Sequence, residues 1–155
     1  MKATLLFKFL CEEIDIKQFK HKVDEEIVAF RVNLTHKKGS SLPISIEDDL
    51  VFTFKKEHLL KLCDHYLKDE LDNVELEYVV DCITLREPDD YENEQLIYIL
   101  DSMTDPKVNG EMTKEKMTTI KYEMCPNAFN QMHQNGDNKL LMNDIFEDEN
   151  FEEWK

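Results

Sequence analysis

Residues that interrupt regular secondary structure are scarce in this chain. Only 3 glycines and 4 prolines occur among its 155 residues. A sheet of many strands needs many tight turns, and such turns draw heavily on glycine and proline. The sequence therefore predicts an all-α fold. Hydrophobic residues make up 41% of the chain, which is enough to bury one core.

The first 54 residues are the ambiguous part of this prediction. Residues 3–12 fit a helix with Leu5, Leu6, Phe9 and Leu10 on one face. They also fit a strand with Leu5, Phe7, Phe9 and Cys11 on one face. Residues 44–54 fit either a short strand or a loop packed under helices. A short strand pair within residues 1–54 is therefore the alternative to helix and loop in this region.

Helical spacing is clearer elsewhere. After Asp15, apolar residues step by four, four and three, which places them on one stripe of a helix: Phe19, Val23, Ile27 and Phe30. Residues 55–70 form a second amphipathic pattern. Asp72 and Glu75 have the spacing of a capping box, which marks a helix start. The core face of that third helix comprises Leu76, Val79, Val80 and Ile83.

The same spacing of Asp89 and Glu92 predicts a further helix start. Asn109-Gly110 predicts a turn, since both residues tolerate positive φ. Thr113 is placed to cap a last helix, and Pro126 to end it. We therefore expect an irregular bundle of five to six helices over residues 1–125.

Residues 126–155 are predicted to be an acidic, partly docked C-terminal tail. Their aromatic residues set them apart from a fully disordered segment. Two interpretations stay open: Phe151 and Trp154 pack back on the domain, or they bind a partner.

The ends and the cysteines indicate a cytoplasmic protein. The apolar run 4–11 is interrupted by Lys8 and lacks the small-residue cleavage site of a secretory signal. No apolar stretch approaches the roughly 20 residues that a membrane span needs. The four cysteines are widely spaced, which predicts small core residues and no disulfide framework.

Motifs that would carry chemistry are not found in the sequence. His58, Cys63 and His65 do not share one helical face, so we expect no metal site there. Residues 105–116 resemble part of a calcium loop, but Lys107 and Lys116 occupy ligand positions. Neither a nucleophile elbow nor a glycine-rich phosphate loop occurs. We therefore expect no enzyme activity, no cofactor and no metal.

The distribution of charge is the most informative pattern. The chain has 34 acidic and 19 basic residues, a net charge of −15. Residues 1–40 hold 8 basic and 6 acidic residues, whereas residues 64–94 hold 12 acidic and 2 basic residues. Like charges at this density repel phosphate backbones and anionic membranes. The chain is therefore expected to bind neither nucleic acid nor membrane, and the charge favours a basic protein partner.

The central segments resemble small helical immunity proteins of bacterial polymorphic toxin systems, which include contact-dependent growth inhibition. The resemblance rests on LLKLCDHYL (59–67), on EL (70–71), on LEYVVD (76–81) and on the segment 100–113 with its Thr-Asp-Pro and Asn-Gly turns. It covers residues 55–123. It implies a cytoplasmic protein that binds one cognate toxin domain and blocks it.

The acidic block suits this role, because toxin nucleases tend to be basic and complementary charge speeds association. The residues expected to contact the partner are Asp69, Glu70, Asp72, Glu75, Glu77, Tyr78, Asp81, Asp89 and Asp90. Tyr78 would be an aromatic anchor among the charges. The alternative is an acidic adaptor or regulatory protein-binding module without a toxin partner.

Overall fold

All regular secondary structure is helical in residues 1–36, 44–87, 90–104 and 106–125, the residues described by the computed structural model. This confirms the all-α prediction. The seven helices are α1 (Ala3–Leu10), α2 (Ile16–His36), α3 (Lys56–Leu67), α4 (Asn73–Thr84), α5 (Glu94–Ser102), α6 (Pro106–Asn109) and α7 (Lys114–Met124). The sequence predicted five or six. The single turn of α6 lies in a segment that was expected to contain only a turn. None of these helices is both long and apolar enough to cross a bilayer.

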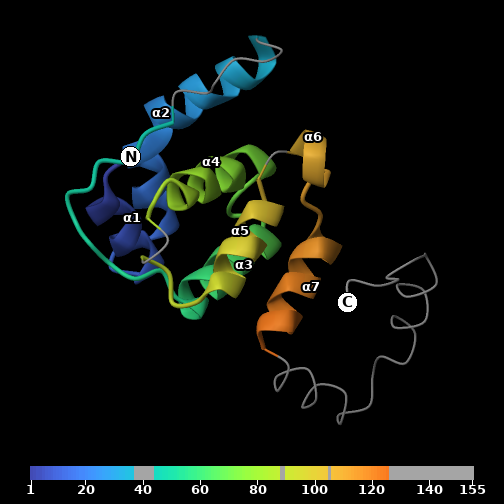
Figure 1. Ribbon diagram of the computed structural model, residues 1–155. Helices are drawn as coiled ribbons and strands as arrows, with labels where there is room; N and C mark the ends of the chain where they lie inside the picture. The colour runs from blue at the N-terminus through green and yellow to red at the C-terminus, as the bar shows by residue number, and fades with distance from the viewer. Residues whose placement is uncertain (37–43, 88–89, 105, 126–155) are drawn as a thin grey trace. The chain divides into compact units, whose positions relative to one another are not determined.

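The chain divides into two units, Met1–Met124 and Cys125–Lys155. All seven helices lie in the first unit. The predicted docking of the tail falls outside the described residues. In the first unit α3 packs against α1, α4 and α7, while α4 also packs against α2 and α5 (Figure 1). The helix α4 is therefore covered by three neighbours. This position decides how many of its side chains are exposed.

The predicted apolar stripe of α2 is confirmed as a core face. Phe19, Val23, Ile27 and Phe30 are all buried. The ring of Phe19 stacks on Phe9 of α1 with 4.1 Å between ring centroids. Beyond Phe30 the helix continues for six residues, and Arg31 lies at the start of this extension.

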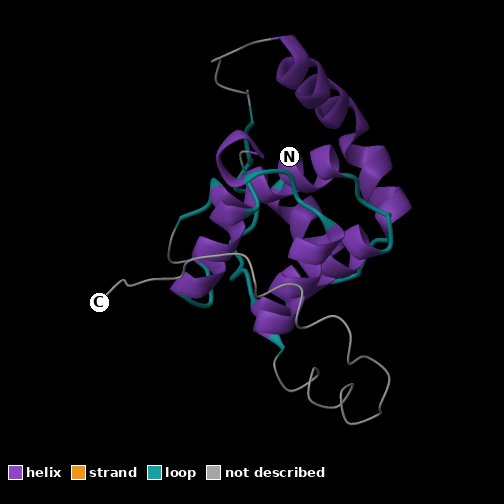
Figure 2. Ribbon diagram, turned by 90° about the vertical axis from the view of Figure 1, so that its right-hand side faces the viewer, coloured by secondary structure: helices purple, strands orange, loops and turns teal. Residues whose placement is uncertain are grey.

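The segment 44–54 contains no strand (Figure 2). It makes one isolated parallel bridge between Lys2 and Glu47 and another between Phe54 and Tyr91. Ala3 N donates to Glu47 O at 2.9 Å, and Glu92 N donates to Phe54 O at 2.9 Å. The possible strand pair in residues 1–54 is thus replaced by helix α1 and a loop with two single-residue bridges.

The helix ends follow the predicted signals with one exception. Asp72 accepts hydrogen bonds from Val74 N and Glu75 N, and Glu75 accepts one from Asp72 N, so the capping box of α4 is confirmed. Thr113 Oγ1 accepts from Lys116 N at the start of α7, and Gly110 has φ +73° in the expected turn.

The exception is α5, for which the predicted capping pair of Asp89 and Glu92 is wrong. The N-cap is Asn93, whose side chain accepts from Leu96 N at 3.2 Å. Glu92 does not act as the capping-box residue of α5. Its backbone N–H donates to Phe54 O, and its carboxylate accepts from Lys56 N. Asp89 itself lies outside the described residues.

Helices α1 and α3 are each followed, two residues after their last helical residue, by an acidic residue in the left-handed region. Glu12 and Asp69 each have φ +59°. Left-handed residues at this position let the following N–H groups reach back to the last turn of the helix. Glu13 N donates to Lys8 O at 2.8 Å, and Glu70 N donates to His65 O at 2.9 Å. In a chain with 3 glycines, acidic residues take the position that glycine usually fills.

Candidate functional site

The predicted acidic surface is only partly on the surface. Glu75 is 7% exposed, Glu77 8% and Tyr78 3%. These three side chains therefore do not present an exposed contact patch in this fold. The sequence pattern predicts one buried face for helix α4. In the structure, α2, α3 and α5 cover most of its circumference.

Tyr78 faces α2. Its hydroxyl donates to Glu26, and its ring meets that of Phe30 with 5.5 Å between centroids. Burial, together with the neighbouring Glu26 carboxylate, raises the pKa of Tyr78. The Met1 amino group lies 2.7 Å from the same carboxylate. Tyr78 thus belongs to a polar contact beneath α2 and is not an exposed anchor.

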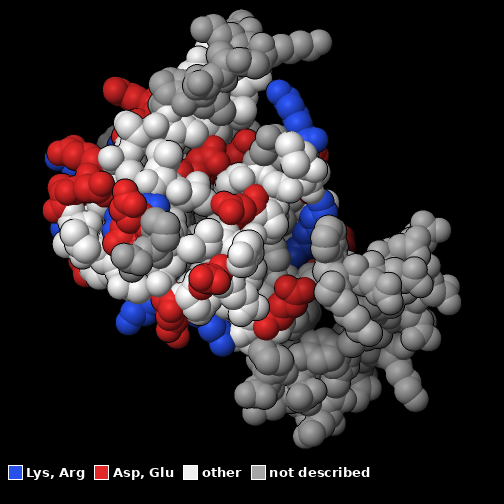
Figure 3. Space-filling model, in the orientation of Figure 1, with Lys and Arg blue, Asp and Glu red and all other residues white. Residues whose placement is uncertain are grey.

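Several of the predicted acidic residues form ion pairs or hydrogen bonds with basic side chains, and in three of the five pairs the partner comes from a distant part of the chain. The pairs are Lys114 with Asp69 (2.7 Å), His65 with Glu70 (2.7 Å), Arg31 with Asp72, Lys20 with Glu75 (2.7 Å) and Arg86 with Asp90 (3.0 Å). Asp81 is half-buried. On the face shown in Figure 3, acidic side chains form several separate groups with uncharged surface between them. Part of the acidic block is therefore paired within the fold.

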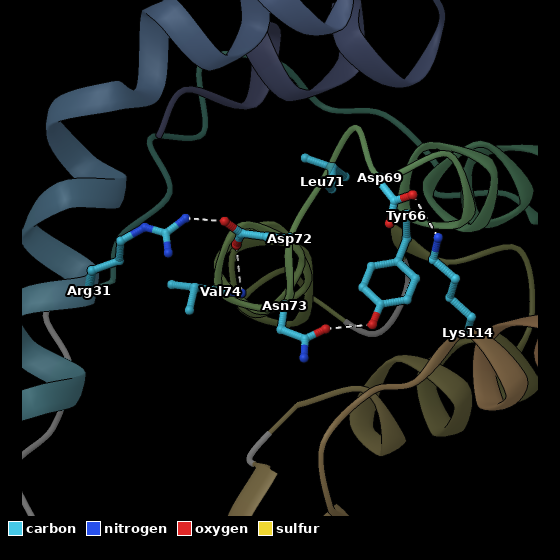
Figure 4. Close-up of a pocket in the computed structure, with 8 residues that line it drawn as sticks. All are labelled: Arg31, Tyr66, Asp69, Leu71, Asp72, Asn73, Val74 and Lys114. Atoms are coloured by element: carbon cyan, nitrogen blue, oxygen red, sulfur yellow. Dashed lines mark hydrogen bonds and ion pairs between the residues drawn. The ribbon is translucent and has the colours of Figure 1, made fainter.

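A pocket of about 420 Å³ lies where α2, the α3–α4 turn and α7 come together, and it contains two of the predicted residues, Asp69 and Asp72 (Figure 4). The complete lining is Arg31, Tyr66, Asp69, Leu71, Asp72, Asn73, Val74 and Lys114. The pair Arg31–Asp72 lies on one side and the pair Asp69–Lys114 on the other, with Tyr66 and Asn73 between them. Sequence reasoning identified the acidic half of this pocket and missed the basic half.

Hydrogen bonds fix the middle of the pocket. The Tyr66 hydroxyl lies 2.5 Å from Asn73 Oδ1 and 2.7 Å from Met112 O. It therefore links α3 to the first turn of α4 and to the segment before α7. Burial raises the pKa of Tyr66, so the hydroxyl keeps its proton. The Tyr66 side chain therefore connects three of the segments around the pocket through hydrogen bonds.

Asp72 is the most strongly engaged carboxylate of the pocket. Partial burial acts to raise its pKa, but hydrogen bonds from Arg31 and from the backbone of Glu75 and Val74 outweigh this effect, and the net pKa lies below the ordinary 3.8. The carboxylate is therefore ionised at neutral pH, with one oxygen committed to the helix cap and the other to Arg31.

A cysteine and a histidine also come together, although they are 47 residues apart. Cys11 Sγ lies 3.8 Å from His58 Nε2. Lys55 N–H donates to His58 Nδ1 at 3.1 Å, so in the neutral ring the proton is on Nε2, the nitrogen that faces the sulfur. That nitrogen has no lone pair with which to accept a thiol proton, and desolvation raises the pKa of Cys11. The pair is therefore not arranged as a nucleophile and its general base.

The buried imidazole makes stability depend on pH. Desolvation is the main cause that lowers the pKa of His58 below its ordinary 6.5. Below pH 6.5 the unfolded chain therefore binds more protons than the folded chain. The free energy of unfolding decreases as the pH is lowered, until the pH is below the pKa of His58 in the folded state. We expect the urea-derived free energy of unfolding to decrease between pH 7 and pH 5 through His58, by at most about 1.4 kcal/mol per pH unit.

His58→Gln is the matched control for this prediction, because glutamine at the third helical position can also accept the N-cap N–H. Its free energy of unfolding should change less over the same pH range. An equal decrease in both proteins would assign the pH dependence to another group.

The segment that resembles part of a calcium loop holds a cation of its own. Lys116 Nζ lies 3.2 Å from Asn109 O and 3.1 Å from Glu111 O. An ammonium group thus occupies the centre of the turn, in agreement with the sequence argument against calcium. Among the described residues, no three His, Cys, Asp or Glu side chains gather in a way that could hold a metal ion.

Comparison with protein-family models, curated proteins and solved structures finds no match for this chain.

Proposed function

We propose that this protein is an immunity protein, which binds and neutralises a cognate toxin domain of basic charge. The observation that carries the proposal is the exposure of two carboxylates at one pocket: the Asp69 side chain is 77% exposed and that of Asp72 is 52% exposed. Among the described residues, three further predicted contact residues are half-buried and would lie toward the edge of such an interface: Glu70, Asp81 and Asp90.

The charge balance supports this proposal. Residues 1–124 hold 27 acidic and 17 basic residues, a net charge of −10. Even after the internal ion pairs are formed, the unit carries an excess of carboxylates that a basic protein would complement. Such complementarity mainly accelerates association and makes it sensitive to salt.

Co-expression tests the proposal directly. The protein should be co-expressed with the product of the gene immediately upstream of its own, since an immunity gene is expected to follow its toxin gene. Rescue of growth and recovery of a stable complex are the expected results, with association slowed by added salt. A complex without rescue would show binding without neutralisation. The absence of both rescue and complex would refute the immunity proposal and leave the alternative, an adaptor or regulatory module without a toxin partner.

A further inference from the structure

The pocket combines an apolar lining with carboxylates on opposite sides. Val74 supplies a half-buried aliphatic side chain, whereas Leu71 and the Tyr66 ring, which also line the pocket, are almost fully buried, at 1% and 8% exposed. Asp72 and Asp69 stand on either side of this lining (Figure 4). A ligand that fits this arrangement needs an apolar stem and a cationic head with several donors.

Both carboxylates are paired with partly exposed cations, Arg31 at 42% and Lys114 at 51% exposed. Lys114 is 51% exposed and its partner Asp69 is more exposed still, and such surface pairs contribute only about 0–1 kcal/mol. Arg31 has a second carboxylate within reach, since Glu75 Oε1 lies 3.9 Å from its Nη2. Arg31 can therefore keep a carboxylate neighbour, shared with Lys20, when Asp72 turns to another donor.

We infer that this pocket receives an arginine side chain of a basic protein partner, which replaces Lys114 on Asp69 and takes the Arg31-facing oxygen of Asp72. The planar guanidinium presents five donors in a fork, stacks on aromatic rings and is less strongly hydrated than an ammonium group. Its three methylenes match the aliphatic lining. The volume of about 420 Å³ accommodates one such side chain. This inference rests on the proposed function and names the chemistry of its contact.

A blocked amino acid provides the probe. N-acetyl-L-arginine methylamide is titrated into the ¹⁵N-labelled full chain, and backbone amide shifts are followed. We expect saturable shifts at residues 69–74 with a dissociation constant in the millimolar range, as for a small ligand with one anchoring group. The norleucine analogue should give no saturable shift, and the lysine analogue should bind more weakly.

Two exposed variants test opposite directions. Asp69→Asn removes one carboxylate and should weaken arginine binding about fivefold or more. Lys114→Gln removes the internal competitor and should strengthen it about two- to fivefold. A merely structural role for this ion pair would give no gain of affinity in Lys114→Gln. Unchanged or weakened binding in that variant, or shifts that lie outside the pocket, would overturn the inference.

Free L-arginine distinguishes a partner's side chain from a small-molecule ligand. The free amino acid should bind no more tightly than the blocked form, and clearly tighter binding of the zwitterion would overturn the docking of a protein side chain. The co-expression experiment keeps the two proposals separate. If the toxin is neutralised equally by the wild type and by Asp69→Asn/Asp72→Asn, the pocket inference fails alone. If arginine binds as expected but no rescue occurs, the toxin proposal fails alone.

Discussion

Replacing Phe19 by alanine should lower the free energy of unfolding by about 4 kcal/mol. Burial of a phenylalanine and the cavity left by its removal account for about 3–5 kcal/mol. Phe19 is fully buried and stacks on Phe9, whose ring in turn lies 5.0 Å from that of His65. This stack joins α2 to α1 and α3, so its loss loosens the helix that carries Arg31. Urea unfolding monitored by circular dichroism measures the effect.

Val28 of the same helix offers a matched control. It is 52% exposed, so Val28→Ala should change stability by no more than about 0.5 kcal/mol. Phe19→Leu keeps most of the volume and should cost about 1–2 kcal/mol. A loss below about 1 kcal/mol in Phe19→Ala would mean that this ring is not packed as described.

Replacing Arg86 by alanine should cost about 3 kcal/mol, because it removes the buried cation of an ion pair and leaves a half-buried carboxylate without its partner. The Arg86 side chain is 1% exposed, and its Nη2 donates to Phe52 O at 3.1 Å and pairs with Asp90 at 3.0 Å. The guanidinium also lies 4.2 Å over the Phe52 ring. Its removal leaves the Asp90 carboxylate and the Phe52 carbonyl without this donor.

Two further variants separate the contribution of the Arg86 guanidinium to stability. Arg86→Lys keeps the charge but loses the fork and the stacking, so it should recover only about half of the loss. Asp48→Asn should be almost neutral, since this carboxylate is 72% exposed and 3.7 Å from Nη1. Arg86 Nε and Nη1 make no hydrogen bond within the described residues. This limits how much stability the guanidinium contributes. If Arg86→Met were as stable as the wild type, packing of the stem alone would explain the residue.

Local patterns in the sequence were sufficient for α2, α3, α4 and α7 and for most of their ends, whereas they left α1 open between helix and strand and did not predict the single turn of α6. The stripe from Phe19 to Phe30 and the capping box at Asp72 depend on residues within one or two turns of each other, so their spacing determines the outcome. The start of α5 was misplaced because the backbone before it pairs with Phe54, 36 or more residues earlier in the chain. No local pattern contains that contact.

The site was predictable only in its acidic half for the same reason. Lys20 and Arg31 reach Glu75 and Asp72 from 55 and 41 residues away. Periodicity shows which face of a helix is apolar, but it does not show how many neighbouring helices cover the other faces. The burial of Glu77 and Tyr78 follows from that coverage.

The left-handed backbone conformation at Asp69 lowers the stability of the fold, while the Asp69 side chain supplies a carboxylate to the proposed contact. An L-residue in that conformation costs roughly 1–2 kcal/mol, which glycine would avoid. Glycine would also delete the carboxylate on which the proposed arginine contact depends. A search for more stable variants would therefore favour glycine at this position while selecting against partner binding. The chain thus keeps a costly turn at the residue whose exposed carboxylate the proposed contact requires.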